Sequence, residues 1–213
     1  LEGSGVGGSR VITLQLGSGC SAAAVRDGRP IDCTMGFSPL EGLMMATRSG
    51  DIDPGLLLWL LEKQGYSAKT LDDLLNRKSG LLGYSGESGD MRVLLESTWD
   101  VSRAGVQLYC FRVQKCIGGF VAALGGVDAV VFGGGVGEHA AVVREQICSP
   151  LVNFGISLDD KRNREPGPGR LALISNEASK AAVYVASVDE SLELVEAVRE
   201  LTKNGDPDER SFR

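Results

Sequence analysis

Hydrophobic positions near the start of the chain follow the short apolar runs typical of β-strands. Two such runs, 11–16 and 22–26, flank the small-residue segment 17–21, and Asp27-Gly28 supplies a second hairpin turn. We therefore predict an antiparallel β-meander at the start of the chain.

Apolar residues at helical spacing follow in the middle of the chain. Helices are predicted at 54–63, at 71–77 with Thr70 as N-cap, at 90–97, and over a longer stretch from about Asp100 to Leu124. The candidate core contacts of the long helix are Val101, Leu108, Phe111, Ile117 and Phe120.

A β-branched run, 127–132, then leads directly into the glycine-rich segment Gly133-Gly-Gly-Val-Gly-Glu138. The pattern from Glu138 onward predicts the start of a helix that continues through Ile147. Strands first, then helices alternating with strands, predict an α/β domain with a mixed central sheet flanked by helices. The remaining predicted elements are short strands near 171–174 and 183–187 and a final helix at 190–201.

The strand, glycine turn and helix around residue 133 are typical of a backbone that lies against a ligand. Glycine lacks a Cβ, so it permits positive φ and close approach of a bound group. A dinucleotide fingerprint would need glycine where Glu138 stands, and the Gly-Lys-Ser/Thr of a P-loop is missing. Two interpretations stay open here: a nucleotide site and a tight βα turn without a ligand.

Composition narrows the possible partners and compartment. The 213 residues carry a net charge of −6 without a visible basic stripe, which argues against nucleic-acid binding. No apolar run reaches the ~18 residues of a membrane span. Five scattered cysteines without a CxxC pair indicate reduced thiols in a cytoplasmic protein rather than a zinc site.

The ends of the chain differ in composition from its body. Residues 1–9 form a glycine-rich lead without the features of a signal peptide, and residues 204–213 form a polar tail. We expect one domain over residues 10–203, in a cytosolic piece of something longer.

Two further segments carry candidate chemistry. Residues 17–21 offer several backbone N–H groups that could form an anion-binding nest, although many hairpins use such residues only to turn. Arg48, flanked by small residues, could direct a guanidinium at an oxyanion, or it could form a salt bridge with Asp51 or Asp53.

Four segments, in order, resemble the motifs of the acetate kinase family over residues 9–201. The most specific is Pro39-Leu-Glu-Gly-Leu-Met-Met-Ala-Thr-Arg-Ser-Gly-Asp-Ile-Asp-Pro54. A second, Gln15-Leu-Gly-Ser-Gly-Cys-Ser21, is similar to the phosphate loop His-Leu-Gly-Asn-Gly-Ala-Ser. Residues 79–92 resemble the Asp-x-Arg nucleotide segment, and residues 132–138 resemble the Gly-Gly-Ile-Gly-Glu loop.

This resemblance implies the actin-like ATPase fold, a ribonuclease H-like architecture shared with sugar kinases and Hsp70. It implies the C-terminal domain of a two-domain enzyme that transfers the γ-phosphoryl group of ATP reversibly to acetate, giving acetyl phosphate and ADP, with Mg²⁺. It also implies a homodimer.

The resemblance also implies roles for individual residues. Arg48 would stabilise the transferring phosphoryl group, Pro39 would line the acetate methyl pocket, and Glu190 would associate with Mg²⁺. Glu190 could equally be a first-turn acid of a helix, and Asp90 a helix N-cap. The nucleotide would lie against Gln15, Leu16, Gly17, Ser18, Gly19, Asp90, Met91, Arg92, Gly134, Gly135, Val136, Gly137 and Glu138.

Several departures from the family pattern keep alternatives open. The family's N-terminal residues, including a substrate arginine and a catalytic aspartate, are not present, and Gln15 and Ser18 replace the phosphate-loop histidine and asparagine. His139 is expected to face solvent in the first turn of a helix. A noncatalytic nucleotide-binding or dimerisation module, and a kinase for propionate or butyrate, are the alternatives to an acetate kinase.

Overall fold

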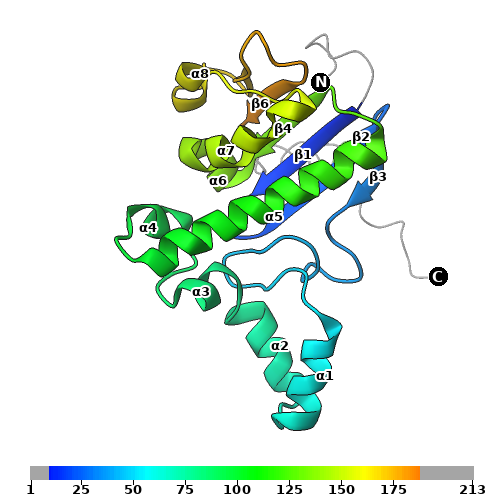
Figure 1. Cartoon of the computed structure of the whole chain (residues 1–213), viewed down its shortest axis with the longest axis vertical. Helices are drawn as coiled ribbons and strands as arrows, with labels where there is room; N and C mark the ends of the chain where they lie inside the picture. Colours follow the sequence, from blue (N-terminus) through cyan, green and yellow to red (C-terminus); the bar gives the residue numbers. More distant parts are fainter. Residues whose placement is uncertain (1–9, 188–213) are drawn as a thin grey trace, which may run out of the picture.

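The computed structural model of the chain describes residues 10–187 and contains one mixed six-stranded sheet (Figure 1). The spatial order is β3-β2-β1-β4-β6-β5. Strand β1 pairs antiparallel with β2 and parallel with β4, β4 pairs parallel with β6, and β5 closes the far edge antiparallel to β6. The strands are β1 Arg10–Leu16, β2 Cys20–Arg26, β3 Arg29–Cys33, β4 Ala129–Gly133, β5 Leu171–Leu173 and β6 Ala182–Ala186.

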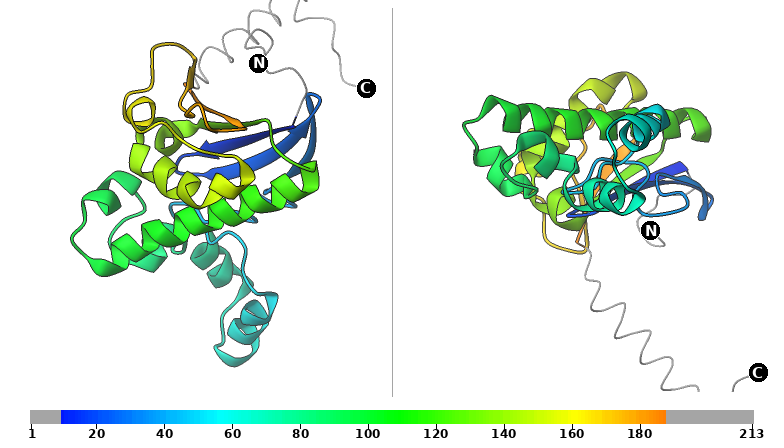
Figure 2. Two further views of the ribbon diagram at one scale, coloured as in Figure 1. Left: turned by 45° about the horizontal axis from the view of Figure 1, so that its top comes forward. Right: turned by 90° about the horizontal axis from the view of Figure 1, so that it is seen from below.

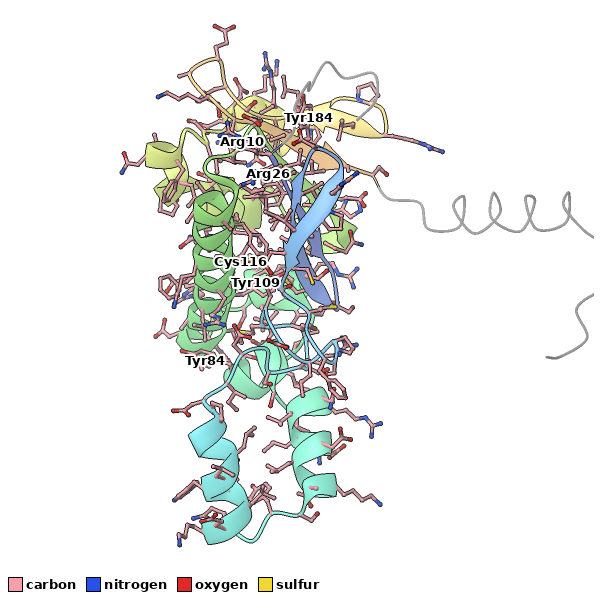
Figure 3. All side chains as sticks on the ribbon, turned by 90° about the vertical axis from the view of Figure 1, so that its right-hand side faces the viewer. Arg10, Arg26, Tyr84, Tyr109, Cys116 and Tyr184 are labelled. Carbon is pink, nitrogen blue, oxygen red and sulfur yellow. The ribbon has the colours of Figure 1, made fainter. Side chains whose placement is uncertain are left out.

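The long helix α5 (Asp100–Leu124) crosses one face of this sheet, as the edge-on view in Figure 3 shows. Successive side chains of a strand point to opposite faces, so Ile12, Leu14 and Leu16 share the face that joins the core, and all three are buried. Ile117 and Phe120 of α5 are buried in the same core. This face anchors the strands whose ends carry the candidate site.

The remaining helices lie on the same core or extend from it. Helices α1 and α2 form an arm that extends away from the sheet (Figures 1 and 2). The bounds are α1 Pro54–Lys63, α2 Ala68–Arg77, α3 Gly80–Ser85, α4 Met91–Glu96, α6 Gly134–His139, α7 Ala141–Cys148, the 3₁₀ helix η1 Ser149–Phe154 and α8 Asp160–Arg164.

Most predicted elements are confirmed. The β-meander, the helix at 54–63, the long helix from Asp100 to Leu124 and the short strands near 171–174 and 183–187 are all present, with small shifts of their ends. In the sheet and the long helix the apolar positions coincide with the buried face, whereas the helix at 54–63 forms without a buried residue. The predicted final helix at 190–201 lies outside the described residues.

Some details of the predictions are wrong. Helix α2 begins at Ala68 with Ser67 as its N-cap, and Thr70 is the residue whose backbone N–H donates to the Ser67 side chain, 3.1 Å away. In α5, Val101 and Phe111 are 42% and 52% exposed, since they lie on the side of the helix away from the sheet. The short helix α3 was not predicted, because its sequence GLLGYS has no helical periodicity to detect.

The glycine-rich turn after β4 is also different from the prediction. Gly134 already begins the helix α6, which ends at His139, and a separate helix α7 follows from Ala141. His139 is exposed, as expected, but it occupies the last turn of α6 rather than a first turn. Glycine has a low helix propensity, so the sequence indicates a loop where packing enforces a helix.

Candidate functional site

The ends of two neighbouring parallel strands place two glycine-rich segments side by side. Gln15 of β1 is in register with Gly133 of β4, so the segments that follow these two parallel strands leave the sheet at the same end of the strands. Gly134 has φ 75°, and a Cβ placed on it would lie 2.6 Å from the Leu16 carbonyl oxygen. Only glycine fits there without strain, and the carboxyl ends of parallel strands are where α/β proteins bind ligands.

The hairpin tip that follows β1 presents its backbone to solvent. Gly17 N–H donates to the Gly19 carbonyl over 2.8 Å, which keeps the tip tight. Gln15, Ser18 and Gly19 are exposed, whereas the Leu16 side chain is fully buried in the core. Leu16 can therefore meet a ligand only through its backbone.

Arg48 lies next to this hairpin tip although it is far away in sequence. The Ala46 N–H donates to the Ser18 carbonyl over 3.1 Å, and an Arg48 Nη1 atom lies 4.0 Å from where a Cβ on Gly19 would be. The same Nη1 donates to the Pro39 carbonyl over 3.1 Å. The structure thus brings together the phosphate-loop candidate, Arg48 and the exposed Pro39.

The alternative salt bridge of Arg48 is wrong. Asp51 instead pairs with Arg112 over 2.6 Å and accepts the Gly42 N–H over 2.8 Å. Asp53 caps helix α1 by accepting the Gly55 N–H over 2.7 Å. These two carboxylates have other partners, so neither neutralises the Arg48 guanidinium.

The Asp90–Arg92 segment forms the start of helix α4. Asp90 is the N-cap, accepting the Arg92 N–H over 2.9 Å, and its carboxylate also accepts two guanidinium N–H groups of Arg92. The Arg92 guanidinium lowers the pKa of Asp90 to about 2. The capping interpretation is confirmed, and the Met91 side chain is buried.

The neighbouring Gly89 brings the start of α4 into contact with the loop that carries Ala46 and Arg48, called the Arg48 loop below. A Cβ on Gly89 would lie 2.8 Å from the Ala46 carbonyl oxygen, so the two backbones are in close contact there. Ala46 therefore joins the hairpin tip on one side and the α4 segment on the other. Sequence reasoning missed Ala46, because a residue that acts only through its backbone carries no side-chain signal.

Helix α6 carries the remaining predicted nucleotide residues, Gly134, Gly135, Val136, Gly137 and Glu138. Its last turn is contacted by Arg144, a buried residue of α7, whose Nη1 donates to the carbonyls of Gly137 and Glu138 over 2.8 Å each. Burial lowers the pKa of Arg144 from its ordinary value. Sequence reasoning missed this residue too, because a single arginine in a short helix usually faces solvent.

Clusters of side chains that could bind a metal ion were sought among the residues that the structure describes. Within residues 10–187, no group of three or more His, Cys, Asp or Glu side chains could hold a metal ion. Glu190, the predicted Mg²⁺ residue, lies outside the described residues. No helix in the described range is long and apolar enough to cross a membrane.

A mixed six-stranded sheet with glycine-rich segments at the carboxyl ends of its central parallel strands defines a domain of the actin-like ATPase fold. Within that fold the chain belongs to the acetokinase family, whose model matches residues 4–196.

Individual relatives agree with this assignment. The acetate kinase of Bacteroides thetaiotaomicron is 44% identical over 199 residues, which cover 92% of this chain and 50% of the relative. The crystal structure of Porphyromonas gingivalis acetate kinase superposes with a TM-score of 0.84 at 39% identity, covering 91% of this chain and 49% of that one. A propionate kinase from Francisella tularensis gives 0.80 at 35% identity, covering 86% and 47%. The chain thus spans about half the length of the relatives it matches.

Proposed function

We propose that this chain is the nucleotide-binding half of an acetate kinase that transfers the γ-phosphoryl group of ATP reversibly to acetate. The observation that carries the proposal is the placement of Arg48. Its guanidinium lies beside the exposed hairpin tip at Gly19 and within hydrogen-bond distance of Pro39, while the nearest acids in sequence are engaged elsewhere. A cation in this position is suited to bind an anionic group.

Phosphoryl transfer depends mainly on positioning and on neutralising charge at the transferring group. In the proposed reaction the exposed backbone at residues 17–19 receives the phosphates, and Arg48 stabilises the charge that develops on the phosphoryl oxygens. Pro39 is exposed and its carbonyl accepts from Arg48, so we assign its ring to the methyl group of acetate.

The adenosine part of the nucleotide is assigned to the backbone of residues 134–138 and to the α4 segment at residues 90–92. In support, Gly134 and the hairpin tip leave the sheet at the same edge, and Gly89 contacts the Arg48 loop. A nucleotide that follows this edge would pass from one glycine-rich segment to the other.

Mg²⁺ would neutralise phosphate charge in the bound nucleotide. From the resemblance to the acetate kinase family, we assign its protein contact to Glu190. A single carboxylate together with phosphate oxygens and water is a common donor set for Mg²⁺.

A complete transfer site requires the half of the relatives' length that this chain does not span. We therefore expect the chain alone to bind ADP with Mg²⁺ weakly and to form little or no acetyl phosphate. Calorimetric titration at millimolar nucleotide tests the first part, and absence of heat would contradict it. Vigorous acetyl phosphate formation by the chain alone would contradict the second part and refute a noncatalytic module.

The role of Arg48 is tested in a two-domain enzyme that contains this chain. Arg48→Ala should abolish most phosphoryl transfer, whereas the matched variant Arg112→Ala, which removes only the ion pair with Asp51, should retain it. Equal kcat/KM values for the parent enzyme and Arg48→Ala would refute the role.

Propionate is a second candidate substrate, because a propionate kinase is among the similar structures. Acetate, propionate and butyrate differ by single methylene groups, each of which changes pocket binding by about 1–3 kcal/mol. We expect the highest kcat/KM for acetate in the two-domain enzyme, and a higher value for propionate or butyrate would reassign the acceptor.

We also propose a homodimer that pairs through helix α1. No residue of this helix is buried, although its apolar side chains lie on all sides, and Leu58 and Trp59 are 58% and 49% exposed. A helix that is apolar all round is normally covered, and an uncharged patch is self-complementary in a two-fold interface.

Sedimentation of the chain tests this interface. Trp59→Glu should convert a dimer to a monomer, whereas Val152→Glu, at a similarly exposed position on η1, should not. A monomeric parent protein at tens of micromolar concentration would contradict the proposal.

A cytoplasmic location is the last part of the proposal. All five cysteines are free, and four of them are at least partly buried. This pattern suits a reducing compartment.

A further inference from the structure

Arg144 is the one charged side chain that is buried among residues 10–187, at 1% exposure. Its side chain extends from α7 and contacts residues of α6 and α8. A buried cation is costly unless its donors are satisfied, so the identity of its partners indicates what it does.

Every partner found for this guanidinium is an uncharged oxygen on a neighbouring element. Nη1 donates to the carbonyls of Gly137 and Glu138, and Nε donates to Asn163 Oδ1 over 2.8 Å. Nη2 donates to the Asn163 carbonyl. Asn163 is itself buried and donates to the Ala141 carbonyl over 2.9 Å, so the network connects α6, α7 and α8.

Helix α6 requires such support because its own sequence favours other conformations. Three of its six residues are glycine, each of which disfavours a helix by about 1 kcal/mol relative to alanine. The last carbonyls of a helix lack intrahelical partners, and Arg144 donates to two of them. The conformation of α6 therefore depends on a side chain outside it.

We infer that Arg144 is a positioning residue, which fixes the glycine helix α6 in the conformation that the nucleotide requires. This inference rests on the proposed function, because it assumes that the nucleotide lies against residues 134–138. Without the guanidinium, α6 samples conformations in which the backbone at Gly134 no longer follows the end of β1. The apparent affinity for the nucleotide then falls in proportion to the fraction of molecules in which α6 keeps its binding conformation.

The test uses this chain with Arg144→Met and Arg144→Lys, and Arg10→Met as the matched control. Arg10 also makes several hydrogen bonds, to Asp128 and to the Gly125 carbonyl, but it begins β1 at the end of the sheet away from α6. Each variant is titrated with ADP and Mg²⁺ at the same interval below its own Tm. Amide hydrogen exchange is followed in parallel at residues 134–140.

For Arg144→Met we expect about tenfold weaker ADP binding, corresponding to a tenfold smaller competent population, and faster exchange concentrated in α6. Arg144→Lys can still donate to a carbonyl, so its ADP affinity and its exchange in α6 should lie between those of Arg144→Met and the parent. This variant provides the test if Arg144→Met does not fold. Arg10→Met should lose thermal stability but bind ADP within twofold of the parent.

Two outcomes separate this inference from the proposed function. Absence of ADP binding by the parent chain would defeat the proposed function and with it the nucleotide role of Arg144. Normal ADP affinity in Arg144→Met, or exchange that rises uniformly over the chain, would overturn the positioning role while leaving the proposed function in place.

Discussion

Two arginines near the carboxyl edge of the sheet have opposite environments. Arg48 is partly exposed and donates to the Pro39 carbonyl and to the Met45 sulfur, whereas Arg144 is buried and donates to four oxygens. The hydrogen bonds found for Arg48 within the described residues involve Nη1 alone, whereas Arg144 donates through Nε, Nη1 and Nη2 to oxygens of the fold. A partly satisfied cation beside an exposed backbone is the arrangement expected of a ligand site, whereas a buried and fully satisfied cation stabilises the fold.

Removing each guanidinium is the strongest way to test this difference. Arg144→Met should lower the free energy of unfolding by about 3–5 kcal/mol, because buried oxygens lose their donors. Arg48→Met should change it by less than about 0.5 kcal/mol. Denaturant unfolding of both variants measures the contrast, and equal losses would mean that Arg48 is structural too.

Two glycines with positive φ, Gly134 and Gly125, test the contact between α6 and β1 at the level of the backbone. Gly134→Ala should cost about 2–3 kcal/mol, because φ is 75° and the added Cβ would lie 2.6 Å from the Leu16 carbonyl oxygen. Gly125→Ala is the control, with φ 71° and open space around the Cβ, and should cost about 1 kcal/mol. Thermal unfolding of the two variants decides whether close contact with β1 adds to the conformational cost.

Burial also affects a thiol, Cys148, but its expected effect on the free energy of unfolding is smaller than that of the buried arginine. Burial raises the pKa of Cys148 from about 9 to about 12, so the folded state retains a proton that the unfolded state releases. The free energy of unfolding that this proton contributes is fully present below pH 9. It is lost as the pH rises toward 12, and about 1.4 kcal/mol is lost at pH 10. The Tm of Cys148→Ala should therefore decline less between pH 8 and 10 than that of the parent, and parallel declines would contradict the assignment.

The sequence predicts the sheet and the long helix because their hydrophobic periodicity coincides with the buried face. It also brings Arg48 and the hairpin tip to attention through the types of residues they contain. It does not predict helix α6, because its three glycines indicate a loop and the stabilising contacts come from Arg144 on another helix. Nor does it reveal Ala46, whose contribution to the candidate site is made by backbone atoms alone.

A nucleotide site formed by the two glycine-rich segments is tested most directly by amide hydrogen exchange of this chain with and without ADP and Mg²⁺. We expect slower exchange at residues 17–19 and 134–138 on nucleotide addition, with no change in the arm at residues 54–77. Unchanged exchange at both glycine-rich segments under millimolar ADP, or protection confined to the arm, would contradict a nucleotide site at this edge of the sheet.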